Sequence, residues 1–290
     1  MSTLQAILKT MRPKQWTKNI FVFAALVFDG KLTRPGPLLK VTALFALFCL
    51  ISSSVYLLND LADIEKDRAH PKKRHRPLAS GALKPAYAVI ALLVLMSFSL
   101  IAAYWLDPAA ALVLATYFVM NVAYSFWLKH MVILDVLTIA AGFVLRVAAG
   151  AAVVHVERFS PWLYVCITLG ALLIALGKRR AELMALEDGA RAHRAILEEY
   201  TINFLDHLIS LTTGATIVTY SLYTFSAHNL PQNHLMMLTV PILIYFLFRY
   251  LYLIHVRQLG GAPDELIFKD KPLFISAIFW ALAAVIILYL

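Results

Sequence analysis

Nine apolar stretches, most of them about 20 residues long and nearly free of charge, constrain this chain more than any other feature of its sequence. The stretches run over residues 16–28, 41–58, 86–106, 109–128, 133–153, 161–176, 204–225, 235–254 and 273–290. In lipid, only a helix satisfies every backbone N–H and C=O group within one segment, and about 20 apolar residues match the hydrocarbon thickness. The sequence therefore predicts an all-α, polytopic membrane bundle of about nine transmembrane helices.

The composition agrees with a membrane protein. The chain is 61% hydrophobic and 15% charged, with a mean hydropathy of +0.75, whereas a soluble domain is near half apolar and a quarter charged. No internal repeat and no low-complexity linker is visible, so residues 1–290 are predicted to form a single transmembrane domain. Cys49 and Cys166 both lie in apolar stretches, and neither predicts a disulfide or a metal pair.

The lysines and arginines predict the orientation of the bundle. With the N-terminus inside, the outer side receives only four of the 26, and a fifth lies within a span: Lys31, Arg34, Lys40 and Arg158 outside, and Arg146 in the span. This asymmetry favours an N-inside, C-outside arrangement. The net charge of +9 is then concentrated on the inner face, where basic residues also contact anionic lipid. No basic arm or reading module accompanies the charge, so no nucleic-acid partner is expected.

A run of acidic residues follows the second apolar stretch. A helix turns by about 100° per residue. With this step, four polar residues of the predicted helix lie on one side, within an arc of about 100°: Asn59, Asp60, Asp63 and Asp67. Glu65 points to the far side. Like charges at this spacing destabilise a helix unless a cation compensates. Mg²⁺ prefers oxygen ligands and is typically shared between carboxylates and substrate phosphates, so the four residues predict a magnesium site. The alternative is a solvated helix end whose charges pair with Lys66 and Arg68.

A basic loop comes directly after the acidic run. Pro77 and Gly81 mark it as a loop, and Lys73, Arg74 and Arg76 give it dense positive charge. Guanidinium groups bind phosphate oxygens in a bidentate manner. Carboxylates with Mg²⁺ on one wall and these cations on the other predict a cradle for a diphosphate group.

These residues resemble a known family. The run from Asn59 to Asp67, followed by Arg-Pro-Leu-Ala-Ser-Gly at residues 76–81, looks like the first signature of UbiA-superfamily prenyltransferases. The opening at residues 12–19 fits the same superfamily, and the length, the predicted number of spans and the orientation agree, so the resemblance covers essentially the whole chain. It implies a Mg²⁺-dependent membrane transferase with Asp60, Asp63 and Asp67 as catalytic residues.

The second half departs from members that act on aromatic acceptors, which usually carry another Asp-x-x-x-Asp after the sixth span. That place holds the run Lys178-Arg179-Arg180 and Glu182, and Tyr124, Lys129 and Asp135 stand between the fourth and fifth spans. The combination is similar to the decaprenyl-phosphate phosphoribosyltransferase branch, whose members transfer 5-phosphoribose from phosphoribosyl diphosphate to a polyprenyl phosphate. More cations suit a donor with a second phosphate and an anionic lipid acceptor. Positive-inside anchoring is the alternative explanation for the run at 178–180.

Three residues near the first span are expected to bind an anionic group. Lys14 and Lys18 stand at i,i+4, on one face of a predicted helix, and Asn19 follows them. They would grip either the lipid phosphate or the diphosphate of the donor.

The remaining candidates keep two roles each. Arg146 is expected to point toward a phosphate, with a structural partner such as Asp135 as the alternative. Asp135 would contact a ribose hydroxyl or orient Lys129, and Glu182 would add a ligand to the metal or to the ribose.

The predicted partners are phosphoribosyl diphosphate, a polyprenyl phosphate and the membrane. By family inference, the reaction takes place on the cytoplasmic side of a bacterial inner (plasma) membrane and feeds cell-wall biosynthesis. Two other functions remain open. One is transfer of an isoprenoid from its diphosphate to an aromatic or other small acceptor, with Glu182, Glu187 and Asp188 replacing the second acidic motif. The other is a non-enzymatic polyprenyl-phosphate carrier, although clustered acids would repel its anionic cargo. The oligomeric state is open too, a homo-oligomer included.

Overall fold

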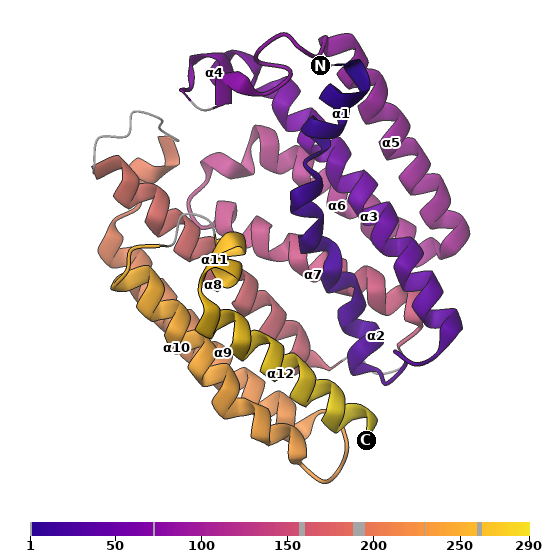
Figure 1. Ribbon diagram of the computed structural model, residues 1–290, viewed down its shortest axis with the longest axis vertical. Helices are drawn as coiled ribbons and strands as arrows, with labels where there is room; N and C mark the ends of the chain where they lie inside the picture. Colours follow the sequence, from indigo (N-terminus) through magenta and orange to yellow (C-terminus); the bar gives the residue numbers. More distant parts are fainter. Residues whose placement is uncertain (1, 72, 157–159, 188–194, 229, 260–262) are drawn as a thin grey trace. The chain divides into compact units, whose positions relative to one another are not determined.

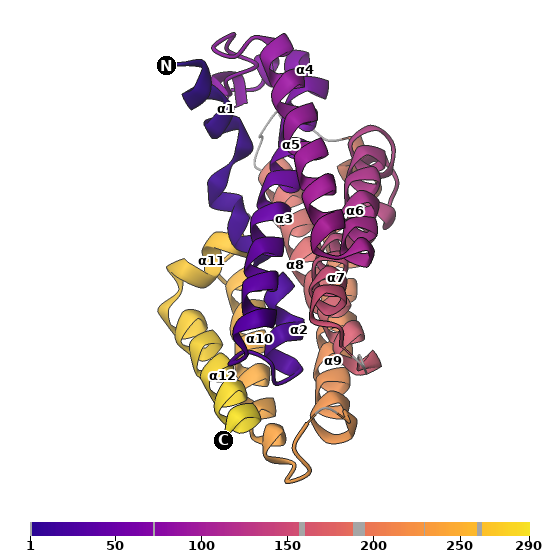
Figure 2. The ribbon, with the colours of Figure 1, turned by 90° about the vertical axis from the view of Figure 1, so that its right-hand side faces the viewer.

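A computed structural model describes residues 2–71, 73–156, 160–187, 195–228, 230–259 and 263–290 (Figures 1 and 2). Every regular element in these ranges is a helix, which confirms the predicted all-α class. Arg158, Asp188 and the side chain of Glu187, which entered the sequence predictions, lie outside the described residues.

The chain divides into two compact units, each with its own core. Unit 1 contains Met1–Val27, Lys31–Lys129 and Leu145–Val156, and unit 2 contains Phe28–Gly30, His130–Val144 and Glu157–Leu290. That the whole chain is a single transmembrane domain stays a prediction.

Unit 1 is built from the first half of the chain. Its elements are α1 (Thr3–Met11), the 3₁₀ helix η1 (Pro13–Phe23), α2 (Ala24–Phe28), α3 (Pro35–Ala62), α4 (Ile64–Ala69), η2 (Lys73–His75), α5 (Pro85–Leu106), α6 (Pro108–Phe126), η3 (Leu128–His130) and the end of α7 (Leu134–Val154). In both views α5 lies along α3, and α1 and α4 lie at the same end of this unit (Figures 1 and 2). The acidic end of α3 therefore meets the start of the chain.

Unit 2 is built from the second half. Its elements are the start of α7, α8 (Pro161–Glu187), η4 (Ala195–Glu199), α9 (Ile202–Ser226), η5 (Leu235–Thr239), α10 (Val240–His255), α11 (Pro263–Lys269) and α12 (Lys271–Tyr289). Helix α9 packs against α8 and α10, and α10 packs against α12 (Figure 1). Apolar side chains of these helices fill the core, among them Leu176, Ile209, Leu253 and Leu273.

Proline marks the first residue of four long helices, at Pro35, Pro85, Pro108 and Pro161. Its fixed φ suits the first turn, where the missing N–H would lack an intrahelical partner in any case. Asp107 strengthens one of these starts, because its carboxylate accepts a hydrogen bond from the N–H of Ala110 at 2.9 Å. The sequence itself thus sets where these helices begin.

Seven helical segments of the described part are long and apolar enough to cross a membrane: α3, α5, α6, α7, α8, the η5–α10 segment and α12. Helix α5 shows why they suit lipid. It buries Ala88 and Leu92 and exposes Ile90, Val94 and Phe98, so it is apolar on all sides. The protein is therefore a multi-pass membrane protein, while the number of nine spans and their orientation stay predictions.

The first predicted span, 16–28, is not a regular α-helix. Its segment folds as the 11-residue η1 followed by the five-residue α2. At about 2.0 Å per 3₁₀ residue and 1.5 Å per α residue, the two together reach about 30 Å, close to the hydrocarbon thickness. With about three residues per turn, Lys14 and Lys18 lie about 120° apart. The expectation that they share one face is therefore wrong.

The seventh predicted span, 204–225, lies within α9 but is not among the seven segments. Buried threonines make this helix more polar than its neighbours. The hydroxyls of Thr213 and Thr216 donate to the carbonyl oxygens four residues earlier, at 2.8 and 2.7 Å, so their polarity is satisfied inside the helix.

The backbone of η1 approaches α7 closely within unit 1. A Cβ atom added at Gly150 would lie 2.0 Å from the carbonyl oxygen of Val22, closer than two such atoms can stand. Around this contact Val22, Phe48 and Leu114 form part of the buried core of the unit. Gly150 is therefore required for the position of η1.

We expect Gly150→Ala to destabilise the protein by about 1–3 kcal/mol, because the added methyl group must displace the backbone of η1. Thermal unfolding of the purified protein in detergent measures the effect. Gly170→Ala in α8 is the matched control, since its Cβ meets nothing within 4 Å, and it should leave stability equal or raise it by up to ~1 kcal/mol. Equal melting temperatures for the two variants would contradict the packing described.

Candidate functional site

The acidic run lies where α3 gives way to α4. Helix α3 ends at Ala62, and Asp63 leaves helical geometry with φ −106° and ψ 15° before α4 begins. The sequence predicts one continuous helix here, whereas the structure has two helices separated by the single residue Asp63. Hydrogen bonds still span the break, from the N–H of Asp63 to the Asn59 carbonyl (3.0 Å) and from the N–H of Asp67 to the Asp63 carbonyl (2.8 Å). Because this i→i−4 pattern persists, Asp60 and Asp67 stay on one side.

Two arginines neutralise these two carboxylates. Asp60 Oδ1 accepts from Arg12 Nη2 and, at 3.2 Å, from Arg76 Nη1. The same Nη1 donates to Asp67 Oδ2 at 2.7 Å. The side chain of Asp60 is 2% exposed, so its carboxylate lies largely out of water. Asp60 and Asp67 therefore converge on one cationic nitrogen.

The other two members of the acidic run contact the end of α6 and η3. Lys129 Nζ lies 3.4 Å from Asp63 Oδ1, and the hydroxyl of Ser125 donates to Asn59 Oδ1. Glu65 points away from all of them and is 82% exposed, as the helical arc predicts. The alternative prediction is a solvated helix end whose acids pair with Lys66 and Arg68. Glu65 fits that description, because its carboxylate accepts a hydrogen bond from Arg68 at 2.7 Å.

The donor set suits a hard divalent cation. Within the described residues no group of three or more His, Cys, Asp or Glu side chains is close enough to hold a metal by itself. Mg²⁺, however, is usually bound through one or two carboxylates and completes its shell with water and substrate phosphates. Asp60 and Asp67 already bring two carboxylate oxygens to one positive centre, Arg76 Nη1. These residues therefore fit Mg²⁺ shared with a phosphate ligand.

The remaining predicted cations of unit 1 lie around this end. Lys73 is half-buried in η2, and Arg74 beside it is exposed. Lys14 is exposed on η1, whereas Lys18 is half-buried. Tyr124 lies half-buried in α6, one residue before Ser125.

Asn19 and Arg146 meet in a buried polar cluster. Arg146 Nε donates to Asn19 Oδ1 at 2.8 Å, and its Nη2 donates to the hydroxyl oxygen of Tyr117 at 3.0 Å. The amide of Asn19 reaches Ser52 Oγ at 3.3 Å in turn. Asn19 is fully buried and Arg146 is 7% exposed, so the cluster ties η1 to α3, α6 and α7. Their predicted contact with a substrate phosphate stays a prediction.

Asp135 is the centre of a second buried network, in unit 2. Its Oδ2 accepts from Arg179 Nε at 2.6 Å, and its Oδ1 accepts from the Tyr200 hydroxyl at 2.8 Å. Arg179 also bonds to Glu182. The Tyr200 oxygen accepts from the N–H of Ile133, whose φ of 69° is unusual for a β-branched residue. The network therefore fixes the turn that starts α7.

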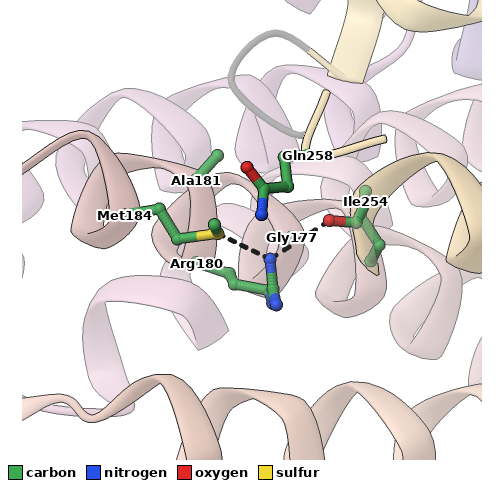
Figure 3. A pocket seen from close by; sticks show the side chains of 6 residues that line it. All are labelled: Gly177, Arg180, Ala181, Met184, Ile254 and Gln258. Carbon is green, nitrogen blue, oxygen red and sulfur yellow. Dashed lines mark hydrogen bonds between the residues drawn. The ribbon is translucent and has the colours of Figure 1, made fainter. Parts of the chain in front are cut away.

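Arg180 holds three helices of unit 2 together. Its Nε donates to Asp206 Oδ1 at 2.5 Å, and its Nη1 donates to the carbonyl of Ile254 at 3.1 Å. Figure 3 shows the guanidinium between this carbonyl and Met184, at a hollow with an empty volume of about 160 Å³. Almost no part of this hollow is wide enough for a sphere the size of a water molecule, so it is too small for a substrate.

Several side-chain partners of the predicted residues were not predicted from the sequence, among them Arg12, Ser52, Tyr117, Ser125, Tyr200 and Asp206. Arg12 is the first residue of the motif at residues 12–19, and Ser125 follows the predicted site residue Tyr124. The local sequence could therefore have indicated both. Tyr200 had no local signal, because it contacts Asp135 across 65 positions.

Comparison with known proteins agrees with this architecture. The sequence matches the UbiA prenyltransferase family over residues 19–278. The decaprenyl-phosphate phosphoribosyltransferase of Mycolicibacterium smegmatis is 35% identical, over 96% of this chain and 90% of its own length. The protein of that name from Mycobacterium tuberculosis is 34% identical, over 94% and 91%. The structure of a UbiA homolog from Archaeoglobus fulgidus bound to GPP and Mg²⁺ has a TM-score of 0.75 at 17% identity and covers 98% of this chain and 100% of that one.

The apolar helices and the charged end of α3 define a multi-pass membrane protein with an oxygen-rich, polybasic site. The chain belongs to the UbiA prenyltransferase family.

We expect Tyr200→Phe to cost about 1–3 kcal/mol, since it leaves the N–H of Ile133 and one oxygen of Asp135 without their partner. Burial, together with the bond to Asp135, raises the pKa of Tyr200 to about 12. The unfolded tyrosine ionises near pH 10, so this stabilisation is complete below pH 10 and is lost as the pH rises toward 12. The difference in melting temperature between wild type and Tyr200→Phe should therefore narrow as the pH rises from about 10 to about 12. Tyr87→Phe, at an exposed tyrosine of α5, is the control. A gap that stays constant across this pH range would contradict the buried network.

Proposed function

We propose that this chain transfers 5-phosphoribose from phosphoribosyl diphosphate to a polyprenyl phosphate of the decaprenyl type and releases diphosphate. The observation that carries the proposal is similarity over nearly the whole chain. Relatives that are 32–35% identical over 94–98% of it are decaprenyl-phosphate phosphoribosyltransferases. The chain in turn covers 87–91% of those proteins, so it spans almost all of the relatives it matches.

The acidic end of α3 would hold Mg²⁺ through Asn59, Asp60, Asp63 and Asp67. Bound there, the cation would neutralise the negative charge that develops on the departing diphosphate. Support comes from the oxygen-only donor set and from the convergence of Asp60 and Asp67 on one nitrogen. The GPP and Mg²⁺ bound to the Archaeoglobus fulgidus homolog are consistent with this assignment.

The basic residues of unit 1 would bind the phosphate oxygens of the donor. Arg76 and Lys129 already contact the carboxylates, and Lys73 and Arg74 stand on the loop that follows α4. Cations in these positions withdraw charge from the leaving group without any proton transfer. Lys14 and Lys18, together with Tyr124, would contact the phosphate of the donor or of the lipid.

The acceptor phosphate is already anionic, so the reaction needs no general base. One of its oxygens forms a bond to C1 of the ribose, and the bond from C1 to the diphosphate breaks with the electron pair leaving on the diphosphate. Sugar transfer of this kind passes through a transition state with oxocarbenium character. The protein would therefore act by positioning and charge neutralisation.

The buried arginines would act through other residues. Arg179 and Arg180 are neutralised by Asp135, Glu182 and Asp206, and Arg146 is bonded to Asn19. We assign them positioning roles within their own units. Lys178, half-buried beside them, would contact a phosphate directly.

The setting follows from the same proposal. The bundle would lie in the inner (plasma) membrane with its acidic site on the cytoplasmic side, where phosphoribosyl diphosphate is available. The basic inner loops support this orientation. A role in cell-wall biosynthesis belongs with the decaprenyl-type acceptor.

We expect purified protein in detergent to transfer radiolabel from phosphoribosyl diphosphate to a polyprenyl phosphate in the presence of Mg²⁺. Asp63→Asn should lower the rate by about 100-fold or more, because it removes a charge from the proposed metal site. Glu65→Gln is the matched control, since this carboxylate of the same acidic run is 82% exposed, and it should stay within about twofold of wild type.

Two results would contradict the proposal in different ways. In the first, no labelled lipid forms, but the protein transfers an isoprenoid from its diphosphate to a small acceptor. This result would overturn phosphoribosyl diphosphate as the donor and leave the proposed metal site in place. Binding of polyprenyl phosphate without turnover of either donor would favour a carrier.

A further inference from the structure

The carboxylates of the acidic site are already matched by cations of the chain. Asp60 pairs with Arg12 and Arg76, Asp67 pairs with Arg76, and Asp63 pairs with Lys129. The three carboxylates and the three cations thus balance one another at this site. A site of this kind differs from an open carboxylate cluster, because a metal ion must compete with resident cations.

The two sides of these ion pairs differ in burial. The side chains of Asp60 and Asp67 are 2% and 5% exposed, whereas those of Arg12 and Arg76 are 30% and 29% exposed. The carboxylates are therefore fixed in the protein, and the guanidinium groups reach them from the surface. When the pairs open, the arginines can turn toward another anion while the acids stay in place.

Arg12 is well placed for such a change. It lies between α1 and η1 with a left-handed φ of 53°, and its guanidinium stands 4.9 Å from the ring centre of Tyr56. A cation–π contact of this kind holds the charge near α3 at a modest free energy, about 0.5–2 kcal/mol. The side chain thus has a second contact besides Asp60.

We propose that Arg12 and Arg76 are resident counter-cations of this site, which a divalent metal displaces from Asp60 and Asp67 and which then bind the diphosphate that accompanies the metal. The inference rests on the metal site of the proposed function. It adds Arg12 as a phosphate-binding residue and makes the binding of the two ligands interdependent.

The charges explain the interdependence. A divalent cation entering alone adds two positive charges beside Arg12, Arg76 and Lys129, so it binds weakly. A diphosphate entering alone meets arginines that are engaged with carboxylates. Together the metal takes the carboxylates and the diphosphate takes the arginines. Each ligand must then raise the affinity of the other by the same factor.

The test is a titration of the full-length protein in detergent with Mn²⁺, which suits the same oxygen ligands as Mg²⁺ and is followed by electron paramagnetic resonance. Each titration is run with and without inorganic diphosphate. In wild type, diphosphate should tighten Mn²⁺ binding by about tenfold or more. Arg12→Gln and Arg76→Gln should each tighten the binding of Mn²⁺ alone by about fivefold and reduce the enhancement by diphosphate.

Arg68→Gln is the matched control. Arg68 lies on α4 in the same segment, but its carboxylate partner is Glu65, which faces away from the site, so this variant should bind Mn²⁺ as wild type does. Arg12→Lys provides a second test, since it keeps the charge and should leave the affinity for Mn²⁺ alone close to the wild-type value.

The outcomes separate the exchange from the proposed function. Mn²⁺ binding that is equal in wild type, Arg12→Gln and Arg76→Gln would overturn the exchange and leave the metal site intact. Wild-type protein that binds no Mn²⁺, with or without diphosphate, would overturn the metal site and the exchange with it. If Arg12→Gln or Arg76→Gln does not fold, wild type and Arg12→Lys decide the matter: absence of enhancement by diphosphate in both would also overturn the exchange.

Discussion

Charge neutralisation inside an apolar bundle is the constraint on which the rest of this structure depends. A buried carboxylate without a partner costs several kcal/mol. In unit 1 the cost at Asp60 is offset by Arg12 and Arg76, and in unit 2 the cost at Asp135 is offset by Arg179 and by the hydroxyl of Tyr200. Polar side chains are therefore found as linked sets, and each set joins helices that are distant in sequence.

The helices deviate from ideal geometry where these sets form. Helix α3 is interrupted at Asp63, the first span is wound as a 3₁₀ helix, and Ile133 takes a left-handed conformation at the start of α7. Strained or irregular backbone persists only where the surrounding contacts determine it. Here the contacts are the ion pair of Asp63 and the hydrogen bond from the N–H of Ile133 to Tyr200.

The two units use arginine in different ways. In unit 2 Arg179 is 1% exposed and pairs with the fully buried Asp135, so it links α8 to the start of α7. In unit 1 Arg12 and Arg76 are partly exposed, although the acids that they contact are buried. Buried carboxylates with accessible cations suit a site that exchanges charged ligands. Ion pairs in which both partners are buried suit a structural role. This contrast gives the basic residues of a UbiA-family protein two separate physical roles.

The sequence by itself determined the class of fold and the location of the acidic site. The length of the apolar stretches determines that they form helices in lipid, and proline determines where four of these helices begin. The spacing from Asn59 to Asp67 places these polar side chains on one face of a helix and Glu65 outside that face. These are local properties, and helical periodicity alone carries them. Only the tertiary structure decided the pairing of each charge, such as Arg179 with Asp135 across 44 positions or Tyr200 with Asp135 across 65. It also decided that the segment with Lys14 and Lys18 winds as a 3₁₀ helix. The physical reason is that such pairings and backbone departures depend on which helices pack together, and no local pattern encodes that choice.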